Sequence, residues 1–491
     1  MQRTLAHAGI TLGLVVCALA SVASAAPNKK AALDRLATQY HQLRQFNGTL
    51  LVANEKGILL EKAYGSANLE WQVPHTLDTK FRVGSVTKMF TAMVILQLVA
   101  EGKLDLDAPV SRYLPDYRKD TGARVTLTHL LNHTSGIPSF TSHPDYQSKI
   151  ARTPHTIAEL VRLYGSGDLA FEPGSKYAYN NSGYAMLGAI IETVTGKSYA
   201  QAVQERILAP LGMKDSGYDV TATVLPKRAS GYVVMPTGYL NAPYIDMSVP
   251  NAAGSLYSTV RDLYRWDRAL YTDKLLPEPL EQRMFTPGLG NYGFGWRVKP
   301  FRLDDGKTQV ATQSHGGDIN GFSSFLVRVP ETKEFVIILD NTSRGDKIQD
   351  LALGLLSILH DVTPREPRPG IGEVVLERLA KEPISKVVAM YRDLKANKST
   401  KYDFSPGQLN TIGYILLRDK RLAEAIEIFK LNVEAHPQDA NAYDSLGEAW
   451  LVSGDDAQAL ANYRRSLELD PDNRNAADAI QRLEQAAKQT P

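Results

Sequence analysis

Hydrophobic positions in the early part of the chain follow first a helical and then a strand-like pattern. Between residues 30 and 46, apolar side chains recur at helical spacing: Leu33, Leu36, Tyr40 and Leu43. From Gly48 to Tyr64 the apolar residues form two short runs on either side of a turn at Asn54–Gly57. This pattern predicts a helix followed by a β-hairpin.

The next hydrophobic run, from Met89 to Val99, is apolar almost all round. A helix without a polar face is buried in a core, so this run predicts a central helix that stops at Gly102. Residues 104–280 favour helices and loops, with one helix expected over Tyr184–Val194.

Strand-like runs return late in the chain, at 294–298, 321–329 and 335–339. Strands at both ends with helices inserted between them favour an α+β domain, built on an antiparallel sheet with a helical insertion. They argue against a doubly wound parallel sheet, in which strands and helices would alternate throughout.

A repeat follows a proline-rich linker near the C-terminus. Residues 363–370 cannot continue a helix, and 371–397 then predict a helical segment. Several positions recur 34 residues later: Leu417, Ala425, Phe429 and Pro437 return as Leu451, Ala459, Tyr463 and Pro471, and Gly413 as Gly447. This tail resembles the tetratricopeptide repeat (TPR). Two copies are clear, and the helices expected at 371–397 and 475–488 would close the ends of the stack.

The N-terminus is typical of a secretory signal, with Arg3, an apolar run over Ile10–Leu19 and small residues at Ala23–Ala25. The run is shorter than the roughly twenty residues that span a bilayer. We therefore expect cleavage, no transmembrane anchor, and a periplasmic or secreted location. Cleavage also removes Cys17, the only cysteine, which excludes disulfides and a cysteine nucleophile. A lipid anchor on Cys17 is the alternative, but Val16 stands where a small residue is required.

At 491 residues the chain is too long for one ordinary domain. We expect a signal peptide over 1–25, a globular domain over 26–360, a linker with a helical segment over 361–400, and a TPR-like domain over 401–491. Hydrophobic residues make up 43%, enough for a sizeable core. A net charge of +2 without a long basic block argues against a nucleic-acid partner.

Several common chemistries lack their motifs in this sequence. It contains no Gly-x-Ser-x-Gly elbow, no His-Glu-x-x-His and no phosphate-binding glycine loop. His129 and His133 have metal-like spacing, but their place on a Leu-Leu stretch before a turn favours a structural role. We expect neither a metal nor a cofactor.

The strongest candidate for chemistry is Ser85, three residues before Lys88 at the mouth of the apolar helix. Side chains at i and i+3 share one helix face, so Lys88 can reach the Ser85 hydroxyl. Gly84 allows a tight entry and puts Ser85 in the first turn, where unpaired N–H groups favour a developing negative charge. The competing interpretation is a solvent-facing pair.

Two further stretches bear on this choice. Tyr179 and Asn181 lie on a predicted loop, from which a phenol and an amide can point into one cleft. His315–Gly317 leads towards the apolar strand at 321–329, and glycines on an edge strand let a substrate backbone approach closely. Each stretch alone is weak evidence.

Together and in this order, Ser85–Lys88, Tyr179–Asn181 and His315–Gly317 resemble the three motifs of the serine β-lactamase and penicillin-binding-protein superfamily. The tyrosine in the second motif resembles the class C branch and its esterase and D-peptidase relatives. The resemblance covers about residues 30–355 and extends to further segments: His133–Pro138, Pro173–Gly174, Asn181–Tyr184 and Gly254–Thr259.

The resemblance implies a β-lactamase/transpeptidase-like fold and a nucleophile, Ser85, that forms an acyl-enzyme. A serine hydroxyl needs a positioned base, and Lys88 fills that role only if burial lowers its pKa. Tyr179 would relay the proton to the leaving group and help to activate water. Which of Lys88 and Tyr179 is the main base stays open.

The same resemblance implies that Asn181 orients the lysine and binds the substrate amide. The backbone N–H groups of Ser85 and of Asp318, just past Gly317, would form the oxyanion hole. His315 stands where the penicillin-binding pattern commonly has a lysine that holds a substrate carboxylate, and histidine is mostly neutral at pH 7. This departure weakens the case for a dedicated β-lactamase or carboxypeptidase.

Two hypotheses about function follow. The first is an exported serine hydrolase that acts on an ester, an amide, a D-amino-acid peptide or a β-lactam. The second is a non-catalytic peptidoglycan or peptide receptor, in which the repeats recruit a protein partner. Ser85, Lys88 and Tyr179 are all present, which favours the hydrolase, because a domain freed from catalysis need not retain them.

Overall fold

The central element is a six-stranded antiparallel sheet that joins the two ends of the first 360 residues. A computed structural model describes residues 28–471 and 473–489, so the predicted signal peptide lies outside the described residues. The strand order is β10-β11-β12-β13-β1-β2. The strands are β1 (Gly48–Asn54), β2 (Gly57–Tyr64), β10 (Arg297–Arg302), β11 (Gln309–Ile319), β12 (Phe322–Val329) and β13 (Glu334–Asp340).

Both faces of the sheet are covered, which the alternation of side chains along β1 shows. Leu50 and Val52 point into one core, formed with the helices α1 (Lys29–Gln42) and α10 (Gly345–Leu359). Leu51 and Ala53 point into the other, larger core. Successive residues of a strand face opposite sides, so a strand buried on both sides is apolar throughout.

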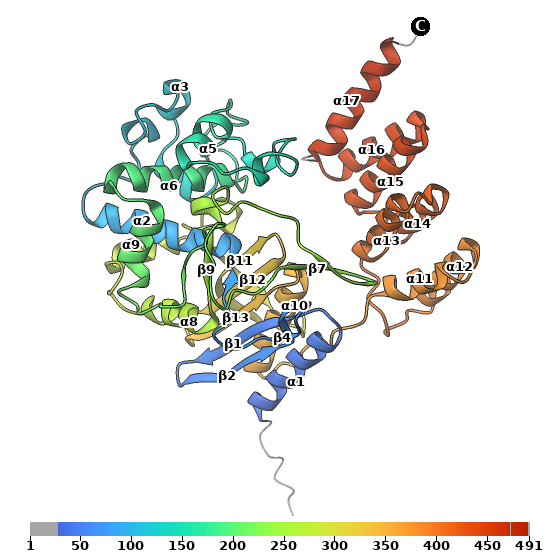
Figure 1. Cartoon of the computed structure of the whole chain (residues 1–491), viewed down its shortest axis with the longest axis horizontal. Helices are drawn as coiled ribbons and strands as arrows, with labels where there is room; N and C mark the ends of the chain where they lie inside the picture. The colour runs from blue at the N-terminus through green and yellow to red at the C-terminus, as the bar shows by residue number, and fades with distance from the viewer. Residues whose placement is uncertain (1–27, 472, 490–491) are drawn as a thin grey trace, which may run out of the picture.

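The inserted helices cover the other face of the sheet (Figure 1), and the larger core lies between the helices and the sheet. The described helices of this part are α2 (Thr87–Ala100), α3 (Lys119–Gly122), α4 (Leu127–Leu131), α5 (Ile157–Tyr164), α6 (Asn181–Thr195), α7 (Tyr199–Val203), α8 (Val260–Ala269) and α9 (Glu278–Met284). The α+β architecture with an antiparallel sheet and a helical insertion is therefore confirmed. α2 is buried on nearly every side, as its sequence predicts.

Two details of the predicted strands are wrong. Short strands occur within the region expected to hold helices and loops: β6 (Gly217–Tyr218), β7 (Tyr232–Met235), β8 (Gly238–Asn241) and β9 (Leu256–Ser258). They are too short for a period of two to be visible. The strand expected at 294–298 begins only at Arg297, because Gly295 has a φ of +78° and turns the chain against α2.

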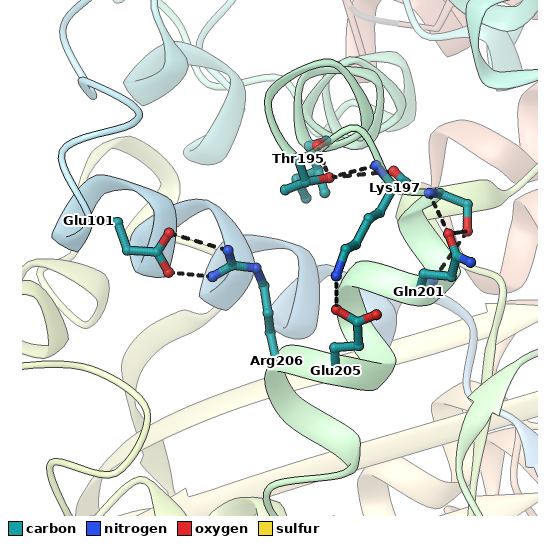
Figure 2. Close-up of polar contacts among 8 residues, drawn as sticks. Glu101, Thr195, Lys197, Gln201, Glu205 and Arg206 are labelled. Atoms are coloured by element: carbon teal, nitrogen blue, oxygen red, sulfur yellow. Dashed lines mark hydrogen bonds and ion pairs between the residues drawn. The ribbon is translucent and has the colours of Figure 1, made fainter.

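Ion pairs on the surface join the end of α2 to the turn Gln204–Leu208 (Figure 2). Arg206 binds Glu101 through both guanidinium nitrogens, at 2.7 and 3.2 Å, and Lys197 pairs with Glu205. Exposed pairs of this kind contribute about 0–1 kcal/mol each. The position of α2 therefore depends mainly on its apolar packing.

A stack of helices follows the sheet domain (orange to red in Figure 1). Its members are α11 (Ile371–Leu379), α12 (Ile384–Ala396), α13 (Pro406–Arg418), α14 (Leu422–Ala435), α15 (Ala440–Ser453), α16 (Asp456–Leu469) and α17 (Arg474–Gln489). The proline-rich segment before it forms neither helix nor strand from 362 to 369. Among the described residues, no helix is both long and apolar enough to cross a membrane.

Candidate active site

Ser85 lies at the junction between α2 and strand β11. Gly84, Ser85 and Val86 form a short 3-10 turn that leads into α2, and Gly84 enters it with a φ of +50°. A Cβ added at Gly317 of β11 would stand 2.1 Å from the carbonyl oxygen of Val83 and 2.8 Å from the backbone nitrogen of Ser85. Glycine at 317 is thus required for β11 to approach the nucleophile turn this closely.

Lys88 is fully buried one helical turn after Ser85. Its Nζ lies 3.0 Å from the Ser85 Oγ, 2.8 Å from the Asn181 Oδ1 and 2.8 Å from the carbonyl oxygen of Ala253. No carboxylate of the described chain lies within ion-pair distance of Lys88. Burial therefore holds the pKa of Lys88 well below its ordinary value.

This geometry fits a neutral amine. Asn181 Oδ1 and the Ala253 carbonyl can only accept, so they take two N–H groups of Lys88. The lone pair of a neutral amine then faces the Ser85 hydroxyl, which can donate its proton to it. The amide of Asn181 is held in turn, because its Nδ2 donates to Thr141 Oγ1 at 3.1 Å.

Tyr179 lies against Lys88, whose Nζ is 4.8 Å from the centre of its ring. Burial raises the pKa of the Tyr179 phenol far above its ordinary value, and an interaction with Ser85 lowers it in part. The ring of His133 packs on Tyr179 with 4.3 Å between centroids, and His133 Nδ1 accepts the N–H of Asn180 at 3.1 Å. His133 thus supports the loop that carries Tyr179, which agrees with the structural role expected for it.

His315 is buried and both of its ring nitrogens are engaged. Nδ1 lies 2.6 Å from the carbonyl oxygen of Gly316, which can only accept, and Nε2 lies 2.7 Å from the hydroxyl of Tyr292. Burial is the main cause that lowers the pKa of His315 to about 3. The imidazole is therefore neutral at pH 7, with its proton on Nδ1.

Beyond Ser314, β11 has no partner on the β10 side, since the pairing with β10 ends at Arg297 and Ser314. The segment from His315 to Ile319 is therefore a local edge strand beside Ser85, although β11 lies inside the sheet. This open edge agrees with the expectation that the glycines there admit a substrate backbone.

Two cavities meet at Ser85 and Asp318. The first, which we call the apolar cavity, has a volume of about 560 Å³, and Asp318 is its only charged lining residue. Its wall includes Phe140, Tyr146, Asn181 and Ile245. The second, the charged cavity, has about 650 Å³ and is lined by Tyr179, Arg297, Lys299, His315, Asp318 and Asp346. Five of the predicted site residues line one or both cavities: Ser85, Tyr179, Asn181, His315 and Asp318. Lys88 and Gly317 line neither cavity but lie next to Ser85.

Sequence reasoning missed three contributors to this cleft. The Ala253 carbonyl is a backbone group and has no signal in the sequence. Tyr292 is recognisable only by its contact with His315. Arg297 brings a permanent cation into the charged cavity, at the point where His315 supplies none.

Comparison with known proteins decides the family. A model of the family described as Beta-lactamase matches residues 33–357 of this chain. The chain belongs to the β-lactamase family. The helices from α11 onward lie outside that match.

Relatives of this β-lactamase-family chain include penicillin-binding proteins and an amidase. Penicillin-binding protein 4* of Bacillus subtilis is 29% identical over 347 residues, which are 66% of this chain and 75% of that protein. Putative penicillin-binding protein PbpX of the same organism is 32% identical over 305 residues, or 62% and 72%. The D-amino acid amidase of Ochrobactrum anthropi SV3 superposes with a TM-score of 0.60 and 27% identity, covering 68% of this chain and 99% of that one. The chain is therefore a serine hydrolase of this family.

Proposed function

We propose that this protein is an exported amidohydrolase that forms an acyl-enzyme on Ser85, with neutral Lys88 as the base. The observation that carries the proposal is the 3.0 Å contact between Lys88 Nζ and Ser85 Oγ. Asn181 Oδ1 and the Ala253 carbonyl take both N–H groups of the neutral amine, so its lone pair faces the hydroxyl. A buried lysine without a carboxylate partner is the kind of base that serine activation needs. The signal-like N-terminus supports export.

Tyr179 fits the role of proton relay better than that of resting base. Its raised pKa keeps the phenol protonated at pH 7, so it can pass a proton to a leaving amine but does not start as a phenolate. This difference supports Lys88 rather than Tyr179 as the base in our proposal. The N–H groups of Ser85 and Asp318 would bind the oxyanion, because Gly317 brings β11 against the nucleophile turn.

The residues that line the two cavities suggest where each half of a substrate would bind. Asn181 lines only the apolar cavity, so the acyl half would lie there, and an acyl group with an apolar side chain of modest size fits its walls. Tyr179 lines only the charged cavity, so the leaving half would lie there. Arg297 would hold a carboxylate on that half. Amides and peptides of apolar D-amino acids fit this division, and one relative is named a D-amino acid amidase.

A hydrolysis panel tests the proposal. We expect turnover of D-phenylalanine amide and D-phenylalanyl peptides, and slower turnover of nitrocefin and p-nitrophenyl acetate. Labelling by a fluorophosphonate is expected on the wild type and absent in Ser85→Ala, the matched control that keeps every backbone contact. Absence of both turnover and labelling in the wild type would support the receptor hypothesis instead.

The pH dependence of acylation follows from Lys88. Its neutral form is the active one, so kcat/KM should fall as the pH drops through the depressed pKa, and the midpoint should lie well below 10.5. The measurement is a pH profile of ester hydrolysis. The control is His315→Gln, which should retain this acidic limb because the pKa of His315 is about 3. A limb that disappears in His315→Gln would assign it to the histidine.

We also infer that the C-terminal helices are TPR-like repeats, as the 34-residue period suggests. Two matching contacts support this. A Cβ added at Gly413 in α13 would stand 2.4 Å from the ring of Phe429 in α14, and one at Gly447 in α15 would stand 3.1 Å from the ring of Tyr463 in α16. The same small residue meets the same aromatic position in both helix pairs. A face left open by such pairs would suit a protein partner.

The β7–β8 hairpin extends from the sheet domain to the helical stack (Figure 1). Met235 at the end of β7 packs against the core of the helical stack, while Val233 lines the apolar cavity. Arg44 fixes the turn by donating to the carbonyl of Pro236 at 3.2 Å and pairs with Glu373 of α11. The stack therefore supports one wall of the cavity that would hold the acyl group.

Loosening that support should change affinity for a large acyl group. For Met235→Ser we expect a KM for D-phenylalanine amide raised about threefold, with kcat unchanged, because roughly 1 kcal/mol of packing is lost. Steady-state kinetics on this amide and on the smaller D-alanine amide measure the effect. Val452→Ser, an exposed position on α15, is the control. An unchanged KM would leave partner recruitment as the role of the stack.

A further inference from the structure

The charged cavity carries opposite charges on opposite walls. Arg297 and Lys299 come from β10, and Asp318 and Asp346 come from the end of β11 and the start of α10. Within the described chain, Arg297, Lys299 and Asp318 make no ion pair with one another or with any other residue. Groups of both signs are thus held apart around one space that ends at Ser85.

The Asp318 carboxylate is fixed in place but not satisfied. Ser323 Oγ donates to Asp318 Oδ1 at 2.6 Å, and a Cβ added at Gly345 would stand 2.5 Å from the same oxygen. Asp318 Oδ2 has no hydrogen-bond partner among the described residues, and the residue is exposed within the cleft. Lys347 of α10 is bound to Asp403 at 3.0 Å and makes a longer ion pair with Asp346 at 3.7 Å, which leaves the Asp346 side chain 72% exposed.

The walls of the cleft partly desolvate the Asp318 carboxylate, which raises its pKa; the hydrogen bond from Ser323 lowers this pKa, and the charge of Asp346 adds to the rise. Two carboxylates that face one cavity repel each other, and a cation placed between them removes the repulsion. Arg297 and Lys299 would repel the same cation if it carried no negative charge of its own. The charge pattern therefore fits a ligand with both signs.

We propose that the charged cavity recognises a leaving amine that is itself a diamino acid, with its carboxylate towards Arg297 and its side-chain ammonium between Asp318 and Asp346. This proposal rests on the proposed function, since it takes the Tyr179 side as the leaving side. In the step concerned, the Ser85 Oγ–carbon bond forms, the amide C–N bond breaks, and the proton removed from Ser85 passes to the departing nitrogen. Water then releases the acyl group as its acid.

The test compares two dipeptides that differ in one charge, D-phenylalanyl-D-lysine and D-phenylalanyl-D-norleucine. We expect kcat/KM for the lysine peptide to be about tenfold higher, the value of one charge-assisted hydrogen bond. In Asp318→Asn, which keeps the backbone N–H and the shape, this ratio should fall to about two or less. Glu331→Gln, an exposed acid in the β12–β13 turn, should keep the wild-type ratio.

The possible outcomes distinguish failure of the diamino-acid proposal from failure of the proposed hydrolase function. A ratio near one in the wild type, or a ratio that Asp318→Asn leaves unchanged, would overturn the diamino acid. Hydrolysis of esters and simple amides with no cleavage of either dipeptide would overturn it as well. Failure of every substrate and of fluorophosphonate labelling would instead overturn the proposed function. A second expected result is that 0.5 M salt lowers the ratio, because the cavity is open to solvent.

Discussion

Replacing Lys88 with methionine is expected to lower kcat/KM about 10⁴-fold, close to the effect of removing the nucleophile itself. Methionine preserves the length of the side chain but has no lone pair that can take the Ser85 proton. It also leaves Asn181 Oδ1 and the Ala253 carbonyl without their donor. Steady-state kinetics and the rate of fluorophosphonate labelling both measure the loss, and labelling isolates the acylation step.

The fold should survive this change. Methionine fills the space of the buried lysine and leaves no charged partner unpaired. Asn181 and Ala253 line a cavity, so water can replace the lost donor to each of them. We expect a melting temperature within a few degrees of the wild type. Lys347→Met, which removes a lysine of α10 that pairs with Asp403, is the matched control and should retain turnover. Retention of more than a tenth of the activity in Lys88→Met would show that another group is the base.

The local part of this site could be predicted because it depends on one helix. The spacing of Ser85 and Lys88 puts them on one face, and the apolar run behind them predicts the burial that lowers the lysine pKa. The same reasoning could not find Arg297. Arg297 lines the cavity from the first residue of β10, and a hydrophobic pattern does not show which polar residue of a strand borders a cavity.

The sheet, too, was predictable only in its local segments. The hairpin β1–β2 was predictable from its own residues, but its pairing with β13 joins Gly48 to Asp340 across nearly the whole domain. The continuous apolar run of β1 fits burial on both faces, but it does not identify the neighbouring strand. The edge at His315–Ile319 likewise depends on where β10 begins, and that point is set by the register Arg297–Ser314.

The helical content of the C-terminal stack was predictable, because the spacing of its apolar residues is local to the sequence. Its contact with the cleft was not, since Met235 belongs to a strand of four residues within a region that favours helices and loops. A short hairpin that leaves one domain to pack on another has no periodicity of its own. Only the fold relates the helical stack to the apolar cavity.

A second large loss of activity is expected from Gly317→Ala. The added Cβ would stand 2.1 Å from the Val83 carbonyl oxygen and 2.8 Å from the Ser85 nitrogen, so β11 must move away from the nucleophile turn. That movement separates the two N–H groups proposed to bind the oxyanion, and losing one such donor lowers kcat about 10²- to 10³-fold. The displaced strand should also cost about 1–3 kcal/mol of stability, visible as a lower melting temperature.

Gly316→Ala is the matched control, because a Cβ there would meet only the ring of Phe325 at 3.4 Å and the Ser324 carbonyl oxygen at 3.7 Å. The two variants add the same methyl group to neighbouring residues of one strand, on opposite faces. We expect Gly316→Ala to stay within about fivefold of the wild type, since ordinary van der Waals contacts need no displacement. If both variants lose activity equally, the loss reflects a distorted strand and not the oxyanion site. A selective loss in Gly317→Ala, seen in kcat more than in KM, would place the transition-state oxyanion between β11 and the start of α2.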